Sequence, residues 1–82
     1  MACFCYILEC ADGTYYTGWT TDPRRREAQH NRGRGARYTG QRRPVRLVYV
    51  EEQSDRAAAM RRERQLKNLT HAQKKALAES QR

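Results

Sequence analysis

Alternation of apolar and polar side chains predicts three β-strands. Residues 2–9 alternate and are rich in β-formers, and residues 14–19 continue after a short interruption. In residues 45–51, Val45, Leu47 and Tyr49 fall on one side of a strand, and Arg46, Val48 and Val50 fall on the other. The sequence therefore predicts two strands near the N-terminus and a third in the middle of the chain.

The segment between the first two strands, residues 10–13, is typical of a hairpin loop. Its length determines which side chains share a face of the sheet. A two-residue turn puts Tyr6 and Tyr16 on opposite faces. A three-residue loop with Gly13 in the left-handed region pairs Tyr6 with Gly18 and puts both tyrosines on one face. We expect the three-residue loop.

Capping residues mark three helix starts: Asp22 with Pro23, Ser54 or Asp55, and Thr70 with Gln73. We expect the helices to end at about residues 31, 67 and 78. Residues 32–44, with three glycines, five arginines and Tyr38, are expected to form a basic loop. The predicted order is ββαβαα in a single domain spanning residues 1–82, which is an α+β arrangement.

Length and composition exclude several classes of protein. The 82 residues leave room for one small core. No apolar run approaches the roughly 20 residues of a membrane span. The N-terminus lacks the basic region of a signal peptide. Cys3, Cys5 and Cys10 are interpreted as reduced thiols at half-buried strand positions, and a metal-binding role is less favoured. Together these features indicate a cytoplasmic protein.

Positive charge is concentrated in the middle of the chain. The net charge is +8, and residues 23–46 carry nine arginines against one glutamate. Arginine makes up 14 of the 17 basic residues, and its planar guanidinium suits phosphate. A polyanionic partner, most simply nucleic acid, is favoured over a solvated basic surface without a ligand.

Glu63 is out of place in the second predicted helix. On a helical projection it falls within the apolar side, near Ala59, Met60 and Leu66. A carboxylate there is costly unless it is paired or binds a metal. One interpretation is an ion pair with an arginine. The other is a ligand for a hard cation such as magnesium or manganese.

The first predicted helix is unusual because Ala28 is its only apolar side chain. Arg26 and His30 are four residues apart and share a face. This face is either an exposed, phosphate-contacting stripe or a pair in which an arginine neutralises a reacting phosphate within reach of a histidine. His71 has no such neighbours and is expected to be a surface histidine.

These residues form an ordered set that resembles the GIY-YIG endonuclease domain, most closely its small, stand-alone bacterial members: Tyr6, Tyr16-Thr17-Gly18, Arg26, His30 and Glu63. The resemblance covers residues 2–78. It implies a small mixed α/β domain with a three-stranded antiparallel sheet flanked by helices. It also implies cleavage of DNA phosphodiester bonds with one divalent cation, magnesium or manganese.

Carried over by position, the resemblance assigns catalytic roles to Tyr6, Tyr16, Arg26 and His30, and makes Glu63 the metal ligand. The sequence departs from the family pattern at three places: Phe4-Cys5 replaces Gly-Ile, Thr17 replaces isoleucine, and Glu27 replaces a common apolar residue. The strand replacements suit a sheet, whereas Glu27 raises the question of how the first helix docks.

The implied reaction is attack of water on a backbone phosphate. Tyr6 is our candidate for the general base, with Tyr16 orienting it or the water. Ionising a free tyrosine at pH 7 costs about 4 kcal/mol, because its ordinary pKa is about 10. His30, with an ordinary pKa near 6.5, is the rival base. The sequence leaves this choice open.

The basic segment and its surroundings supply the expected nucleic-acid contacts: Gly18, Arg25, Arg32, Arg34, Arg37, Tyr38, Arg42, Arg43 and Lys67. Trp19 and Tyr38 either stack on unpaired bases or cover the core. With few residues free to read sequence, we expect selection of DNA structure rather than of sequence.

The second functional hypothesis is a non-catalytic or partner-dependent nucleic-acid-binding module with the same fold. Glu63 favours the enzyme, because a carboxylate works against polyanion affinity. The DNA structure that is cut, RNA as an alternative target, a protein partner and the oligomeric state stay open at this point.

Overall fold

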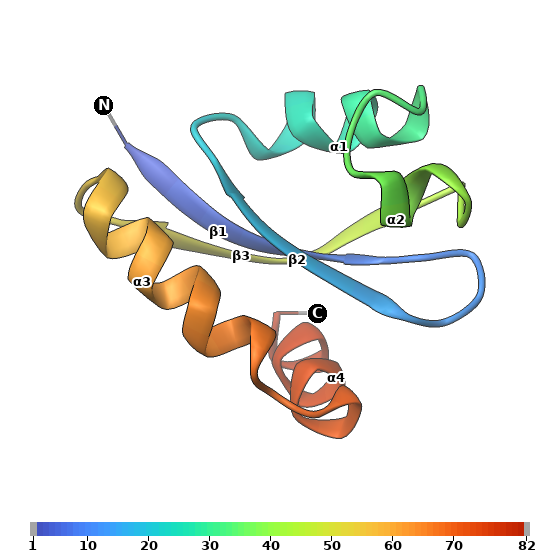
Figure 1. The fold of residues 1–82 in the computed structure, drawn as a ribbon. Helices are drawn as coiled ribbons and strands as arrows, with labels where there is room; N and C mark the ends of the chain where they lie inside the picture. The colour runs from blue at the N-terminus through green and yellow to red at the C-terminus, as the bar shows by residue number, and fades with distance from the viewer. Residues whose placement is uncertain (1, 82) are drawn as a thin grey trace.

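The computed structural model describes residues 2–81 and contains three strands and four helices (Figure 1). Their bounds are β1 (Cys3–Glu9), β2 (Tyr15–Thr20), α1 (Pro23–Asn31), α2 (Arg37–Gly40), β3 (Arg46–Gln53), α3 (Arg56–Lys67) and α4 (His71–Ser80). The predicted order ββαβαα is confirmed. The addition is α2, a single helical turn inside the segment that we expected to be a loop. No helix in the described part is long and apolar enough to cross a membrane.

The capping residues act as the sequence predicted. The Asp22 carboxylate accepts a hydrogen bond from the Arg25 N–H at 3.2 Å. Asp55, rather than Ser54, caps α3. Thr70 and Gln73 form both hydrogen bonds of a capping box at the start of α4. Local side-chain chemistry therefore determines where these three helices begin.

The sheet has the order β2-β1-β3, and both pairings are antiparallel. Tyr6 lies opposite Gly18, as a three-residue loop requires, and Gly13 has a φ of 84°. The expected loop is therefore confirmed. Tyr6 and Tyr16 pack in the same cluster on one face of the sheet.

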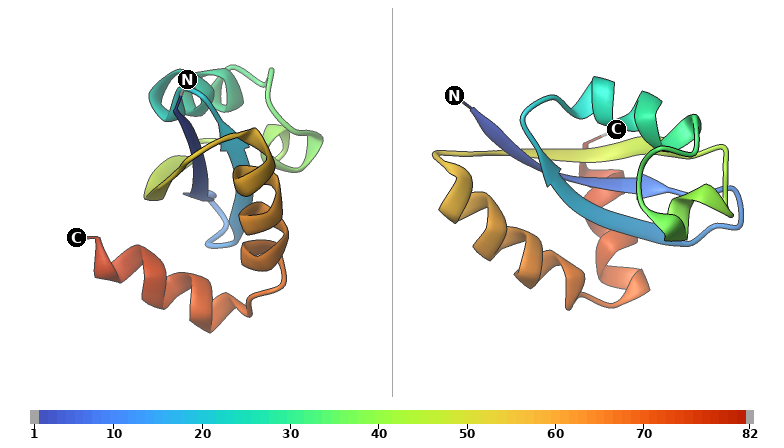
Figure 2. Two further views of the ribbon diagram at one scale, coloured as in Figure 1. Left: turned by 90° about the vertical axis from the view of Figure 1, so that its left-hand side faces the viewer. Right: turned by 45° about the horizontal axis from the view of Figure 1, so that its top comes forward.

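The sheet lies between two helical layers, with α1 and α2 on one face and α3 and α4 on the other (Figures 1 and 2). Each face has its own small core. Cys3 and Cys5 pack with Ala59 and Leu66 under α3, whereas Tyr6, Leu8, Cys10 and Val45 pack on the opposite side. All three cysteines lie within the described residues and none forms a disulfide, and all are buried rather than half-buried as expected.

Polar side chains dock α1 against β3. The Glu27 carboxylate accepts a hydrogen bond from the Leu47 N–H at 2.6 Å. The Asn31 amide accepts from the Val45 N–H at 2.7 Å and donates to the Val45 carbonyl at 2.9 Å. These bonds satisfy backbone groups at the outer edge of the sheet, where another strand would otherwise pair. The glutamate that stands in place of an apolar residue thus docks the helix by a hydrogen bond.

Replacing Asn31 by alanine is expected to lower the free energy of unfolding by about 1–3 kcal/mol, because it leaves two backbone groups of the buried Val45 without partners. Urea denaturation measures the change. Gln41→Ala, which removes an exposed amide from the end of α2, is the control and should change stability by less than about 0.5 kcal/mol. Equal losses in the two variants would contradict this account of how α1 docks.

Candidate active site

Tyr6 of β1 and His30 of α1 meet beneath the surface. The Tyr6 hydroxyl lies 2.9 Å from His30 Nε2. Tyr6 is 2% exposed and His30 is completely buried. His30 therefore does not belong to an exposed stripe on α1, which corrects that expectation. Its imidazole instead joins the helix to the central strand.

The second imidazole nitrogen of His30 is held by α2. Nδ1 lies 2.6 Å from Thr39 Oγ1, and the Thr39 hydroxyl donates its single proton to the Ala36 carbonyl at 2.9 Å. Nδ1 must then carry the proton of the imidazole, and Nε2 accepts from Tyr6. The Ala36 N–H also approaches Nδ1, at 3.4 Å, but this weaker contact does not outweigh the two shorter bonds.

Three residues of this arrangement escaped the sequence analysis: Thr39, Gly35 and Ala36. A Cβ on Gly35 would collide with the His30 ring, so only glycine lets the chain close over the imidazole. Gly18 has a similar task, because its Cβ would lie 2.5 Å from the Tyr6 hydroxyl. Gly18 is buried under Tyr6, so we assign it a packing role in place of the expected nucleic-acid contact. These contacts join residues far apart in the sequence, so no local sequence pattern predicts them.

Burial keeps the Tyr6–His30 pair uncharged. It raises the pKa of Tyr6 to about 12, although the nearby Arg26 works in the opposite direction. It lowers the pKa of His30 to about 4, and the positive charge of Arg26 adds to that effect. At neutral pH the phenol is therefore protonated and the imidazole is neutral, so that Nε2 is free to accept a proton.

Three further predicted residues act on the Tyr6–His30 pair: Tyr16, Arg26 and Glu63. Tyr16 is half-buried, and its ring centroid lies 5.2 Å from that of His30. Burial raises the Tyr16 pKa, Arg26 lowers it and Glu63 raises it again. Glu63 raises the Tyr6 pKa as well. The fold thus brings Tyr6, Tyr16, Arg26, His30 and Glu63 into one site, although they come from four elements.

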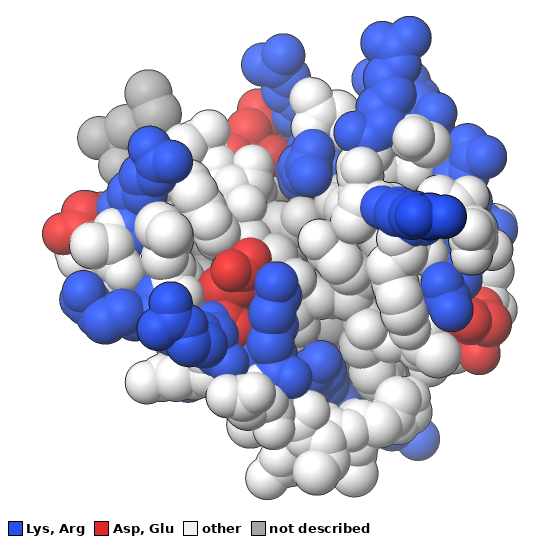
Figure 3. Space-filling view, viewed as in Figure 1, with Lys and Arg blue, Asp and Glu red and all other residues white. Residues whose placement is uncertain are grey.

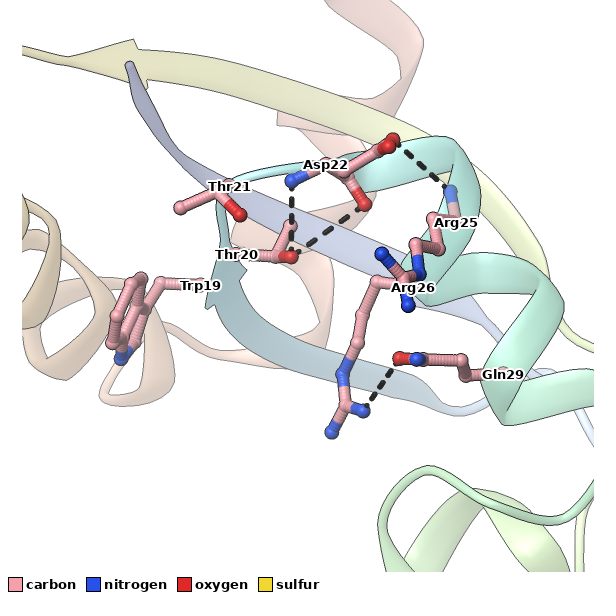
Figure 4. A pocket seen from close by; sticks show the side chains of 7 residues that line it. All are labelled: Trp19, Thr20, Thr21, Asp22, Arg25, Arg26 and Gln29. Carbon is pink, nitrogen blue, oxygen red and sulfur yellow. Dashed lines mark hydrogen bonds between the residues drawn. The ribbon is translucent and has the colours of Figure 1, made fainter. Parts of the chain in front are cut away.

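Arg26 lines a hollow of about 360 Å³ next to this site, with Trp19 and Arg25 among the other lining residues (Figure 4). Its guanidinium donates a hydrogen bond to the Gln29 amide oxygen at 3.0 Å. Figure 4 shows the Arg26 side chain extending beside Gln29, with Trp19 on the opposite side of the hollow. An open hollow with an arginine in its wall suits a phosphate group.

Glu63 does not form the arginine ion pair that was one interpretation of its position. Arg62, the neighbouring arginine, is bound instead by Glu51 at 2.6 Å. Within residues 2–81 the one cation paired with Glu63 is Lys67, at 3.9 Å. The Glu63 side chain is 22% exposed, so its carboxylate is partly desolvated with only a long ionic contact.

The donor set near Glu63 fits a magnesium or manganese ion held by one carboxylate. The described residues contain no cluster of three His, Cys, Asp or Glu side chains that would form a complete metal site. Magnesium commonly keeps several waters and uses one or two carboxylates with substrate phosphate oxygens. A single, partly desolvated glutamate that acts electrostatically on the same two tyrosines as Arg26 is compatible with that mode of binding.

The expected nucleic-acid contacts fall into two groups. Arg25, Arg32, Arg34, Arg37 and Lys67 are exposed. Arg42 and Arg43 also stabilise the segment that holds His30: Arg42 binds Asp12 at 3.1 Å, and Arg43 donates to the Gly40 carbonyl at 3.1 Å. On the face seen in Figure 3, Lys and Arg side chains lie around an uncharged central area. A polyanion would meet positive charge on several sides of this area.

This chain is similar to proteins of one known family. Residues 2–76 match the family model described as the GIY-YIG catalytic domain. A UPF0213 protein of Halobacterium salinarum is 56% identical over 72 residues, which are 88% of this chain and 94% of that protein. A UPF0213 protein of Streptococcus pneumoniae is 49% identical over 71 residues, which are 87% of this chain and 72% of that protein.

Two solved structures share the fold. The solution NMR structure of a UPF0213 protein from Bacillus halodurans has a TM-score of 0.59 and 44% identity, and the match covers 96% of this chain and 84% of that one. The solution NMR structure of a protein from E. faecalis has a TM-score of 0.63 and 39% identity, and the match covers 98% of this chain and 85% of that one. The expected α+β fold is thereby confirmed.

The buried His30 makes a testable contribution to stability. Its pKa is about 4 in the folded protein and near 6.5 when unfolded, so the unfolded chain binds more protons between these values. The free energy of unfolding should fall by up to about 3 kcal/mol as the pH decreases from 6.5 to 4. Urea denaturation across this range should show the decrease in the wild type and in His71→Gln, and a much smaller decrease in His30→Gln. Carboxylates such as Glu51, whose burial is outweighed by the partners Arg62 and Tyr49 that lower its pKa, account for the part that remains. An unchanged pH dependence in His30→Gln would contradict the assignment.

Proposed function

This chain belongs to the GIY-YIG family, whose members are generally endonucleases, and on that basis we propose that it is a metal-dependent endonuclease that hydrolyses phosphodiester bonds of DNA. The observation that carries the proposal is the neutral, hydrogen-bonded Tyr6–His30 pair next to Arg26 and Glu63. This arrangement provides a proton acceptor, a cation for the phosphate and a carboxylate for a metal in one place. A binding module needs none of the three in this combination.

Arg26 is proposed to bind the scissile phosphate. Its guanidinium borders the open hollow and acts electrostatically on both Tyr6 and His30. The phosphate gains negative charge as the attacking water adds, and a fixed cation stabilises that charge. The hydrogen bond to Gln29 holds the guanidinium in position before the substrate arrives.

Tyr6 and His30 are proposed to act in series rather than as rival bases. The Tyr6 oxygen accepts a proton from the attacking water, and the Tyr6 proton passes to His30 Nε2. The hydroxide bonds to phosphorus, and the leaving oxygen takes up a proton from solvent. The Thr39 hydroxyl oxygen accepts a hydrogen bond from Nδ1–H, which stabilises the imidazolium that forms. Burial is the larger cause of the lowered His30 pKa, and the charge of Arg26 is the smaller one. A phosphate bound to Arg26 offsets the smaller contribution and in that way favours this transfer.

Glu63 would hold the divalent cation, magnesium or manganese. When bound, such a cation acts as a Lewis acid on the phosphate and stabilises charge on the leaving oxygen. The Lys and Arg side chains on the face seen in Figure 3 favour a nucleic acid as the substrate. We propose DNA, and RNA offers the same phosphate chemistry. The three buried cysteines, which form no disulfide within the described residues, suit a reducing compartment, so we propose that the protein acts in the cytoplasm.

Two charge-neutralising variants test the site. Glu63→Gln and Arg26→Gln should each lower the rate of metal-dependent cleavage by about 100-fold or more, because each removes a charge that stabilises the transition state. Glu52→Gln and Arg24→Gln are the matched controls, since both side chains are exposed and the charge changes are the same. The measurement is cleavage of branched, single-stranded and duplex DNA with magnesium or manganese, with chelator as the blank.

The outcomes of this assay are distinct. Cleavage that persists in Glu63→Gln would contradict the metal-ligand role. Equal losses in the two arginine variants would show that net charge matters and not the position of Arg26. A folded wild-type protein that binds these DNAs without cutting any of them would support the non-catalytic or partner-dependent binding module instead.

The pH dependence of cleavage tests the proton relay. His30 must be neutral to accept a proton, and its pKa is lowered to about 4, so its working form persists well below pH 6.5. As the pH falls through 6.5, the cleavage rate should therefore stay constant. Tyr6→Phe should be inactive at every pH. The pH–rate profile is measured at saturating metal. If the wild-type rate falls with a midpoint near pH 6.5 and this fall is absent in His30→Gln, the relay through a buried imidazole is contradicted.

A further inference from the structure

A second hollow, of about 340 Å³, adjoins the site along β2. Its lining residues come from β2, α2, α3 and α4: Tyr15, Tyr16, Thr17, Tyr38, Lys67 and Lys74. Tyr16 is shared with the catalytic site, so whatever binds here lies beside the reacting phosphate. The volume falls in the lower part of the range for small-ligand pockets, and the lining combines aromatic rings with two cations.

Tyr38 forms a fixed aromatic surface in this hollow. The Arg42 guanidinium lies 3.8 Å from the centroid of the Tyr38 ring. Arg42 is itself held by Asp12 at 3.1 Å and donates to the Tyr38 carbonyl at 2.9 Å. The ring of Tyr16 is tilted by 26° from that of Tyr38, with centroids 6.1 Å apart. Arg42 thus covers one face of the ring, but Tyr38 is still 37% exposed and lines the hollow, so part of the ring is accessible there.

The two lysines of the hollow favour an anion between them. Burial lowers the pKa of Lys74, and the positive charge of Lys67 lowers it further. Like charges in a partly desolvated groove repel each other, and a phosphate there would relieve the repulsion. Lys67 also lies 3.9 Å from Glu63, so the anion position is next to the candidate metal ligand.

We propose that this hollow, hereafter the Tyr38 groove, binds one unpaired nucleotide of the substrate, with its base against Tyr38 and its phosphate between Lys67 and Lys74. The inference rests on the proposed nuclease function and names its substrate class, a single-stranded or branched nucleic acid. Aromatic side chains stack on the face of a base, and in a duplex these faces are covered by neighbouring bases. The groove therefore selects DNA structure without reading sequence.

A neighbouring hollow of about 230 Å³ extends the groove toward the hairpin. It is lined by Thr14, Tyr15, Tyr38, His71 and Lys74. The His71 ring packs on Tyr15 with centroids 4.8 Å apart, and its Nε2 lies 3.0 Å from the Gly13 carbonyl. A strand entering the catalytic site thus has a path along β2 that continues past the first nucleotide.

Binding of labelled oligonucleotides in the presence of chelator tests the groove without requiring cleavage. The probes are a single-stranded DNA of about 12 nucleotides, an RNA of the same sequence and the fully paired DNA duplex. Tyr38→Ala should weaken binding of the single-stranded DNA by about 5- to 100-fold, as expected for one lost stacking contact. It should leave the duplex affinity unchanged within about twofold, and Tyr38→Phe, which keeps the ring, should bind like the wild type.

The proposed phosphate contact of Lys74 is tested by the salt dependence of DNA binding. Lys74→Gln should lower the slope of log affinity against log salt for single-stranded DNA by about 0.7, the effect of one lost phosphate contact. Lys75→Gln, at the exposed neighbouring position, is the control and should change the slope less. In wild-type protein mixed with thymidine 5′-monophosphate, NMR should show contacts between the Tyr38 ring protons and the base.

The results separate this inference from the proposed nuclease. Equal weakening of single strand and duplex by Tyr38→Ala, or no weakening at all, together with no ring-to-base contacts, would overturn the groove even if the protein cuts DNA. Tyr38-dependent binding by a protein that cuts nothing would uphold the groove and reject the nuclease. Tighter binding of either the DNA or the RNA strand identifies the source of the unpaired nucleotide and supports the groove in both cases.

Discussion

The hydrogen bond between Tyr6 and His30 is the contact on which the arrangement of the site depends. It joins the central strand to α1, a helix with almost no apolar side chains, and both side chains are almost completely buried. Gly18 leaves room for the phenol and Gly35 leaves room for the imidazole. Thr39 completes the chain of hydrogen bonds from α2. The same contact therefore packs the domain and places the proton acceptor of the proposed reaction.

Electrostatics around this bond divide the site into a neutral interior and a charged exterior. Burial keeps Tyr6 and His30 uncharged, whereas Arg26 and Glu63 carry opposite charges close enough to act on both tyrosines. In the proposed reaction, a phosphodiester approaching Arg26 changes this balance and favours transfer of a proton inward. The proposed Tyr38 groove would hold a neighbouring nucleotide of the strand with positive charge and an exposed ring.

Hydrogen bonds from side chains hold elements together at the edge of the sheet, where the small apolar core does not reach. Glu27 and Asn31 dock α1 on the edge of β3, and the Gln81 amide pairs with both backbone groups of Val50 farther along. Glu51 accepts from Arg62, Tyr49 and Gln53 on the other side of the sheet. A chain of 82 residues buries little apolar surface, so these polar contacts secure its edges.

Local patterns in the sequence were sufficient for the strands, three of the helices and the hairpin register. Alternation, Asp22, Asp55 and the Thr70 capping box act over a few residues, and so they can be recognised without a fold. The order of Tyr6, Arg26, His30 and Glu63 likewise indicated the family. The burial of His30, its bond to Thr39 and the turn of α2 were not predictable, because they join residues that only folding brings together. The protonation of Tyr6 and His30 depends on burial as well, since desolvation is a property of the packed site and not of any residue alone.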